Sequence, residues 1–172
     1  MYFLQMFEYF KNIQKKRILK KYYKIFNNLY FDNSLPKIPL IINNVENSET
    51  DGLINYGCFS YTIDYGNMEL IPLYIKISKK LLNDSNKFDL FRDTLVHEMV
   101  HFYEICNNKP TEEEWYRALN SINQLNTSIY AYNYIRKGPR GGHNKFFKDK
   151  CHELNEKYPE LNLREVENSD RL

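Results

Sequence analysis

Residues Asp93 to His101 read DTLVHEMVH and contain a His-Glu-x-x-His motif, His97-Glu98-Met99-Val100-His101. On a helix, side chains four residues apart lie on one face, so His97 and His101 can point at the same metal ion. Histidine nitrogens bind zinc at about 2.0–2.1 Å, and a catalytic zinc normally has three protein ligands. The motif therefore predicts part of a zinc site and requires a third ligand from elsewhere in the chain.

Glu98 follows the first histidine directly and lies about 100° further around the helix. We expect its carboxylate to reach a water at the metal rather than the metal itself. Glu98 would then accept a proton from the water that attacks a peptide carbonyl, and later donate it to the leaving amine. His97 and His101 are thus predicted metal ligands, and Glu98 is the predicted catalytic residue.

The motif lies in a predicted helix from Lys87 to Cys106. Asp84-Ser85-Asn86 offers N-caps, and Asn107-Asn108 followed by Pro110 ends the helix. The side chains around the motif are apolar: Leu95, Val96, Met99, Val100, Phe102 and Tyr103. We therefore expect a buried, central helix whose polar residues need partners. The alternative is that both histidines are hydrogen-bonded core residues.

The third ligand has several candidates. His143 follows two glycines and precedes a predicted helix, whose N-terminal dipole disfavours the charged ring and so favours metal binding. His152 lies within that helix. The carboxylate candidates are Glu104, Glu112 to Glu114, and Glu153. Glu104 is one turn from His101 and is better placed to support a ligand, so His143 is preferred.

Upstream, apolar residues at helical spacing predict one long or two consecutive helices over about 2–30. This region carries a basic strip, which is either a solvated helix face or a nucleic-acid patch. Its members are Lys15, Lys16, Arg17, Lys20, Lys21 and Lys24. The apolar start lacks the features of a signal peptide, and no apolar run is long enough to predict a transmembrane helix.

Three strands are predicted before the motif, over about 35–42, 57–63 and 69–78. Because they are neighbours in sequence, we expect an antiparallel sheet. Pro72 should lie at an edge or a bulge. The segment Leu70–Ile77 could offer a sheet edge to an extended substrate.

After the motif, Thr111 and Glu114 form a capping box that predicts a helix over about 112–125. Phe146, Phe147, Cys151 and Leu154 mark a last amphipathic helix that ends near 158–159. The polar tail after 163 is expected to fray. The fold class expected is α+β, with a small sheet packed on helices around the motif helix.

Length and composition fit one domain with a substantial core: 172 residues, of which 42% are apolar and 16% aromatic. The net charge of +2 gives no general case for nucleic-acid binding. Cys58, Cys106 and Cys151 are far apart and include no CxxC pair, so we expect reduced, mostly buried thiols in a cytoplasmic protein.

Five segments, in order, resemble the SprT-like metalloprotease domain found in Spartan and yeast Wss-type proteases. They are FNNLYFDNSLPKIPLII, GCFSYTIDY, IKISKKLL, FRDTLVHEMVHFYE and GGHNKFFKDKCHELN. The resemblance covers about residues 18–158 and implies a zincin-like fold that binds Zn²⁺. It also implies His97, His101 and His143 as the zinc ligands and Glu98 as the catalytic residue.

The chain departs from this pattern in two ways. The stretch between His101 and His143 is longer than the family's compact loop, which predicts a helical insertion over about 107–137, besides an N-terminal helical extension over about 1–17. Many relatives carry a C-terminal zinc ribbon or DNA-binding tail, and the sequence predicts neither here. A domain without such additions fits a phage or bacterial member of the family.

The expected function is zinc-dependent cleavage of proteins, with DNA-associated proteins, including DNA–protein crosslinks, as substrates implied by the resemblance. DNA could contact a basic loop of Arg136, Lys137 and Arg140 beside His143. The tyrosines Tyr130, Tyr132 and Tyr134 could stabilise an oxyanion, but in so Tyr-rich a chain packing or surface positions are the favoured interpretation. The alternatives are a zinc-stabilised DNA- or protein-binding module without proteolysis, and a repressor-cleaving HExxH peptidase of another family.

Overall fold

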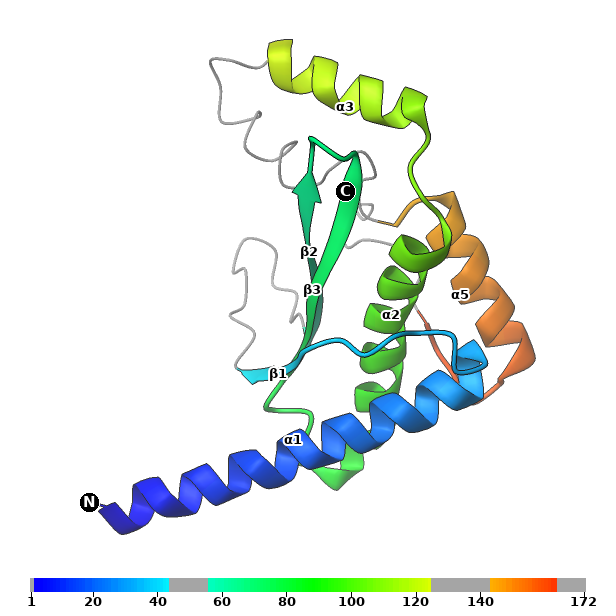
Figure 1. The fold of residues 1–172 in the computed structure, drawn as a ribbon. Coiled ribbons are helices and arrows are strands. Elements are labelled where there is room, and N and C mark those ends of the chain that lie inside the picture. The colour runs from blue at the N-terminus through cyan, green and yellow to red at the C-terminus, as the bar shows by residue number, and fades with distance from the viewer. Residues whose placement is uncertain (1, 44–55, 125–142, 164–172) are drawn as a thin grey trace, which may run out of the picture.

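The computed structural model describes residues 2–43, 56–124 and 143–163 (Figure 1). Helices and strands follow one another in an α+β order. They are α1 (Tyr2–Phe31), β1 (Leu40–Asn43), β2 (Gly57–Asp64), β3 (Glu69–Ser78), the 3-10 helix η1 (Ser85–Lys87), α2 (Phe88–Asn107), α3 (Glu112–Gln124) and α5 (Lys145–Lys157). The predicted helices are all present within one or two residues of their expected bounds.

Among the described residues the sheet has three strands in the order β1-β3-β2. It is mixed, whereas an antiparallel sheet was expected. β2 and β3 form the antiparallel hairpin, whereas β1 pairs in parallel with the end of β3, from Leu40 opposite Ile75 to Asn43 opposite Ser78. The hairpin occupies one side of β3, so β1 takes the other. A parallel pair needs a connection of about a dozen residues or more, which β2 and its flanking segments supply.

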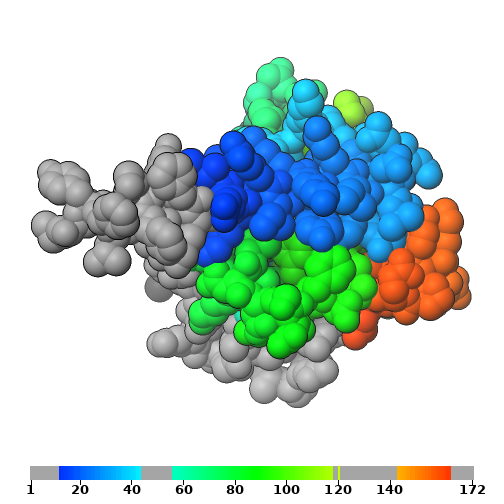
Figure 2. Space-filling view, turned by 90° about the horizontal axis from the view of Figure 1, so that it is seen from below, coloured from blue at the N-terminus to red at the C-terminus, as the bar shows by residue number. Residues whose placement is uncertain are grey.

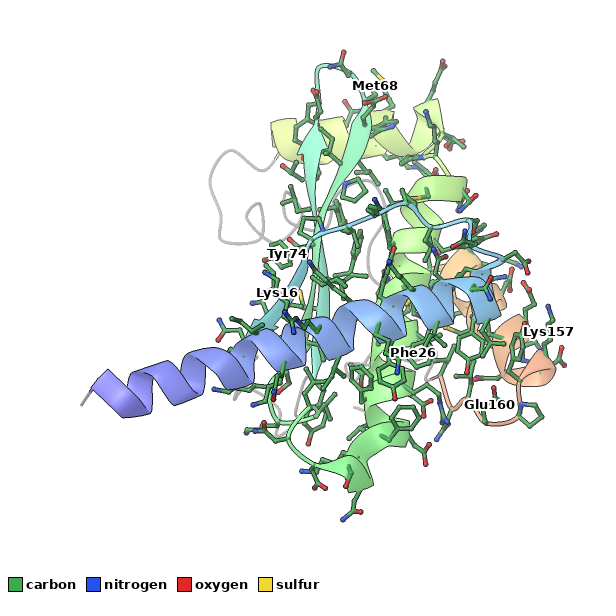
Figure 3. The ribbon with its side chains drawn as sticks, turned by 60° about the horizontal axis from the view of Figure 1, so that its bottom comes forward. Lys16, Phe26, Met68, Tyr74, Lys157 and Glu160 are labelled. Carbon is green, nitrogen blue, oxygen red and sulfur yellow. The ribbon has the colours of Figure 1, made fainter. Side chains whose placement is uncertain are left out.

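β1 is shorter than predicted because Pro36 and Pro39 lack N–H groups and precede it. Pro72 lies opposite Tyr61, where the register of the hairpin shifts, so the predicted bulge is confirmed. Leu70–Ile77 belongs to the central strand, with β2 along its whole length on one side. On the other side β1 pairs only from Ile75 to Ser78, so in the part of the chain that the structure describes the segment 70–74 has no strand partner there and the expected open edge is confined to it. Met68 lies at the exposed tip of the hairpin (Figure 3).

α1 ends where its last turn is tied to the next segment. The side-chain amide of Asn27 donates to the carbonyl of Leu35 at 2.8 Å, and its oxygen accepts from the N–H of Leu35 at 3.0 Å. Asp32 and Asn33 lie in the chain between Asn27 and Leu35 and adopt positive φ angles of 50° and 59°. Asp and Asn tolerate this conformation well. The chain therefore reverses and enters β1.

The core lies between α1, the sheet, α2 and α5. α2 packs against β2, β3 and α5, and its apolar residues Leu95, Val96, Met99 and Val100 are fully buried. From below, α1 lies across the N-terminal part of α2 (Figure 2). Tyr22 of α1 contacts the rings of Phe88 and Phe91 there, and Phe26 is buried beside it (Figure 3).

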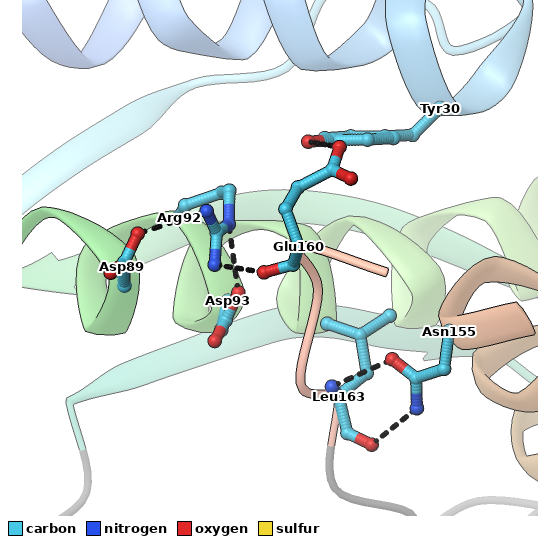
Figure 4. Close-up of polar contacts among 7 residues, drawn as sticks. All are labelled: Tyr30, Asp89, Arg92, Asp93, Asn155, Glu160 and Leu163. Carbon is cyan, nitrogen blue, oxygen red and sulfur yellow. Dashed lines mark hydrogen bonds and ion pairs between the residues drawn. The ribbon is translucent and has the colours of Figure 1, made fainter. Parts of the chain in front are cut away.

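The segment after α5 is held to the body by polar contacts (Figure 4). The buried guanidinium of Arg92 on α2 donates to the backbone carbonyl of Glu160, whose side chain accepts from the hydroxyl of Tyr30 on α1. Asn155 makes hydrogen bonds with both the N–H and the carbonyl of Leu163, each at 2.9 Å. These bonds join α1, α2 and the C-terminal end of α5.

α3 begins with the predicted capping box: the Glu114 carboxylate accepts from the N–H of Thr111 at 2.7 Å, and the Thr111 hydroxyl accepts from the N–H of Glu114 at 3.2 Å. The helix lies near the hairpin end of β2 and β3 (Figure 1), and the buried ring of Trp115 meets Tyr65 edge-on. Of the predicted insertion over about 107–137, the structure describes the part up to residue 124.

The cysteines form no disulfide. Cys151 is buried, Cys58 is partly buried and Cys106 is exposed, so the expectation of mostly buried thiols holds for one of the three in full. Within the described residues, no helix is long and apolar enough to cross a membrane.

Candidate metal centre

His97 and His101 share one face of α2, as their spacing predicts. Their ring centroids are 5.1 Å apart and both side chains are partly buried. The sequence forms a helix here because its apolar residues recur on the side that faces the sheet. The two rings therefore project from a rigid element, which favours precise geometry at the site.

His143 meets this pair from a different part of the chain. It lies just before α5, and its Nε2 is 3.1 Å from Nε2 of His97. Its ring stacks on that of His101 with 5.1 Å between centroids. One ligand atom of each of the three histidines lies within 4.8 Å of the others, which makes them a group able to hold a metal ion.

The donor set fits zinc. Two nitrogens on one tetrahedral zinc, each at about 2.0–2.1 Å, lie about 3.3–3.4 Å apart, close to the separation of His97 and His143. Burial, and then the neighbouring His143, lowers the pKa of His97 to about 3. Burial and both other histidines lower the pKa of His101 well below its ordinary value. These rings are therefore neutral near pH 7, the form that binds a metal ion.

Phe147 packs against all three imidazole rings. It is fully buried on α5, and its ring stacks on His101 at 4.2 Å and on His143 at 4.3 Å, while meeting His97 edge-on at 4.9 Å. The helical pattern predicted an apolar face that includes Phe147, but nothing in it pointed to the histidines. Its ring restricts where each imidazole can turn.

Glu98 lies on the side of α2 that faces β2. Its carboxylate is buried, and Oε2 accepts a hydrogen bond from the N–H of Phe59 at 2.7 Å. Burial raises the pKa of Glu98 to about 8, although the bond from Phe59 acts in the opposite direction. The strand approaches so closely at Gly57 that a Cβ there would lie 2.8 Å from Oε1 of Glu98 and 2.7 Å from Cγ2 of Thr94.

The other predicted ligands lie elsewhere. His152 is exposed and pairs with Glu156 at 3.2 Å, and Glu153 pairs with Lys150. Glu112 to Glu114 form the start of α3. Glu104 is buried, and its Oε1 accepts from the side-chain amide of Asn144 at 2.5 Å.

Several predicted residues lie outside the described part of the chain. They are the basic loop Arg136, Lys137 and Arg140 and the tyrosines Tyr130, Tyr132 and Tyr134. Sequence reasoning also missed Gly57, Phe59 and Asn144. The glycine at the start of a strand was the one visible signal, because glycine there often marks close backbone approach.

Comparison with known proteins gives one result. The family model described as the SprT-like family matches residues 19–131. No curated protein and no solved structure matches the chain. The match includes His97, Glu98 and His101 but ends before His143, so the place of His143 in the cluster rests on the structure.

Proposed function

The chain belongs to the SprT-like family, and from this premise we propose that it is a zinc-dependent metallopeptidase of the HExxH type with a zincin-like fold. One observation carries the proposal: His97, His101 and His143 each bring one ligand atom within 4.8 Å of the others. The three histidines would hold the ion. A zinc ion bound there would polarise a peptide carbonyl and lower the pKa of a water molecule.

Glu98 supplies the proton transfers in this proposal. It shares α2 with two of the proposed ligands, follows His97 directly in the chain, and lies with its carboxylate against β2. Glu98 would accept a proton from the attacking water and donate it to the amine of the departing peptide. Phe59, as the hydrogen-bond donor to Oε2, would hold the carboxylate in place between these transfers.

The proposed substrates are proteins, including those associated with DNA. The resemblance to Spartan-type proteases supports this class. The exposed lysines and arginine along α1, among them Lys16, Arg17, Lys20, Lys21 and Lys24, provide a surface on which a phosphate backbone could bind. The proposed location is the cytoplasm.

Glu98→Gln tests the function. The variant should bind zinc as the wild type does, because no ligand changes, but should cleave an unfolded protein such as reduced, alkylated casein at least about 100-fold more slowly. The matched control is Glu153→Gln, which removes an exposed carboxylate of α5 and should leave the rate unchanged. Cleavage by Glu98→Gln at the wild-type rate would refute the role of Glu98.

The same assay separates the alternatives. Each protein is tested alone, with double-stranded DNA and with single-stranded DNA. Zinc retained by the wild type without cleavage in any of these conditions would favour a zinc-stabilised binding module. Acceleration by DNA would support DNA-associated substrates.

A further inference from the structure

Asn144 uses both ends of its side-chain amide. Its Oδ1 accepts from the N–H of Phe147 at 3.1 Å and thereby caps α5, and its Nδ2 donates to Oε1 of Glu104 on α2 at 2.5 Å. An N-cap needs only the first of these bonds. The second joins the start of α5 to a helix that carries two of the three clustered histidines.

Glu104 is buried, so its carboxylate needs polar partners. It lies one turn after His101 on α2. Tyr61 on β2 is close enough for the charge of Glu104 to help raise the pKa of the tyrosine to about 12, although burial is the larger cause. Charge-assisted bonds of this kind are stronger than neutral ones, so the Glu104–Asn144 bond is well suited to fix one helix against another.

We propose that Glu104 and Asn144 are positioning residues that hold His143 at the metal centre. His97 and His101 keep their spacing through α2 itself, but His143 comes from a separate element and precedes Asn144 directly. The position of the Asn144 backbone therefore sets the distance between Nε2 of His143 and Nε2 of His97. This inference rests on the proposed metal site.

The test compares variants that keep the helix cap but change the bond to α2. Asp caps a helix as well as Asn does, so Asn144→Asp keeps α5 but sets one carboxylate against another. In Glu104→Gln combined with Asn144→Asp, the glutamine amide can donate to the new carboxylate and restore the bond in the opposite direction. Glu104→Ala removes the bond from the other side.

Zinc affinity is measured by competition with a chromogenic chelator, and the geometry of the site by the visible spectrum of the Co²⁺-loaded protein. Asn144→Asp and Glu104→Ala should each weaken zinc binding by about tenfold or more, and the double variant should return to within about threefold of the wild type. The Co²⁺ spectrum should change in the two single variants and recover in the double variant.

Asn155→Ala is the matched control, because it also removes two hydrogen bonds from an asparagine of α5, at the opposite end of the helix. It should lower thermal stability in the presence of chelator but leave zinc affinity unchanged. If Asn144→Asp does not fold, Asn144→Ser, which keeps a cap but is too short to reach Glu104, takes its place.

Unchanged zinc affinity and Co²⁺ spectra in the single variants, or no recovery in the double variant, would overturn the positioning role. Failure of the wild-type protein to bind Zn²⁺ or Co²⁺ would instead refute the metal site on which the role rests. The two failures are therefore distinguishable within one set of measurements.

Discussion

Glu98 and Phe59 are joined by a hydrogen bond of 2.7 Å from the backbone N–H of the strand residue to Oε2 of the helix residue. β2 is an edge strand, so it can offer N–H groups to partners other than β3. The bond draws β2 against α2 at the residue on which the proposed chemistry depends. The packing between strand and helix is therefore part of the candidate site.

Gly57→Ala should destabilise the protein, because the new Cβ would lie 2.7–2.9 Å from side-chain atoms of Thr94 and Glu98. Overpacking of this kind costs about 1–3 kcal/mol. The measurement is the free energy of unfolding in urea. Gly66→Ala is the control, because its Cβ would approach only Oδ1 of Asp64, at 3.4 Å, and should change stability by less than about 0.5 kcal/mol. Equal free energies of unfolding for the two variants would show that β2 shifts to accommodate the new methyl group without loss of stability, and would contradict the prediction.

Phe147→Ala should both unfold more easily and bind zinc more weakly. Truncation of a fully buried phenylalanine costs about 3–5 kcal/mol, and here it also removes the ring that packs against all three histidines. The neighbouring Phe146→Ala provides the comparison, because that ring is partly exposed and stacks on Tyr103 instead. Unfolding in urea and chelator competition are measured on both. Equal losses of zinc affinity would contradict the role assigned to Phe147.

Local patterns in the sequence predicted the elements but not how they pair. Caps and apolar spacing placed α2, α3 and α5 correctly because those signals act within a few residues. The antiparallel arrangement expected for all three strands was wrong for β1, since its parallel pairing with β3 depends on contacts far apart in the chain. Spacing also brought His97 and His101 together. The Glu98–Phe59 bond, the close approach at Gly57 and the two bonds of Asn144 depend on distances between elements, which no periodicity records.

Arg92→Ala should detach the C-terminal segment from α2. The guanidinium bonds to Asp93 at 2.9 Å and to the carbonyl of Glu160, with only 11% of its side chain exposed. Removing one partner of a buried ion pair costs about 3 kcal/mol or more. Asp89→Ala is the matched variant: this partner of Arg92 is 81% exposed, so its loss should cost less than about 1 kcal/mol. Urea unfolding of both variants checks the difference.

The loss of unfolding free energy caused by Arg92→Ala should also depend on pH. Burial is the main reason why the pKa of Asp93 is raised, and Arg92 acts against it, whereas Asp89 adds to it. Without Arg92, the folded-state pKa of Asp93 would rise further. When the pKa of a carboxyl group is higher in the folded than in the unfolded protein, its contribution to stability is fully present at pH values below the unfolded-state pKa. That contribution is lost as the pH rises through the folded-state pKa. The stability difference between wild type and variant should therefore be smaller near pH 4 than at pH 7. A constant difference across that range would rule out Asp93 as the cause.

Zinc should stabilise the wild-type protein but not His143→Ala. A ligand that binds only the folded state adds about 2.7 kcal/mol at a free concentration of 100 times Kd. His143→Ala removes one of the three clustered nitrogens, so its thermal midpoint should respond far less to zinc at the same concentration. His152→Ala removes an exposed histidine of α5 that pairs with Glu156 and should keep the full response. The midpoints are measured by calorimetry in chelator and in buffered zinc, together with the zinc content of each protein. A full zinc response in His143→Ala would exclude that residue as a ligand, and a lost response in His152→Ala would move the site to the exposed face of α5.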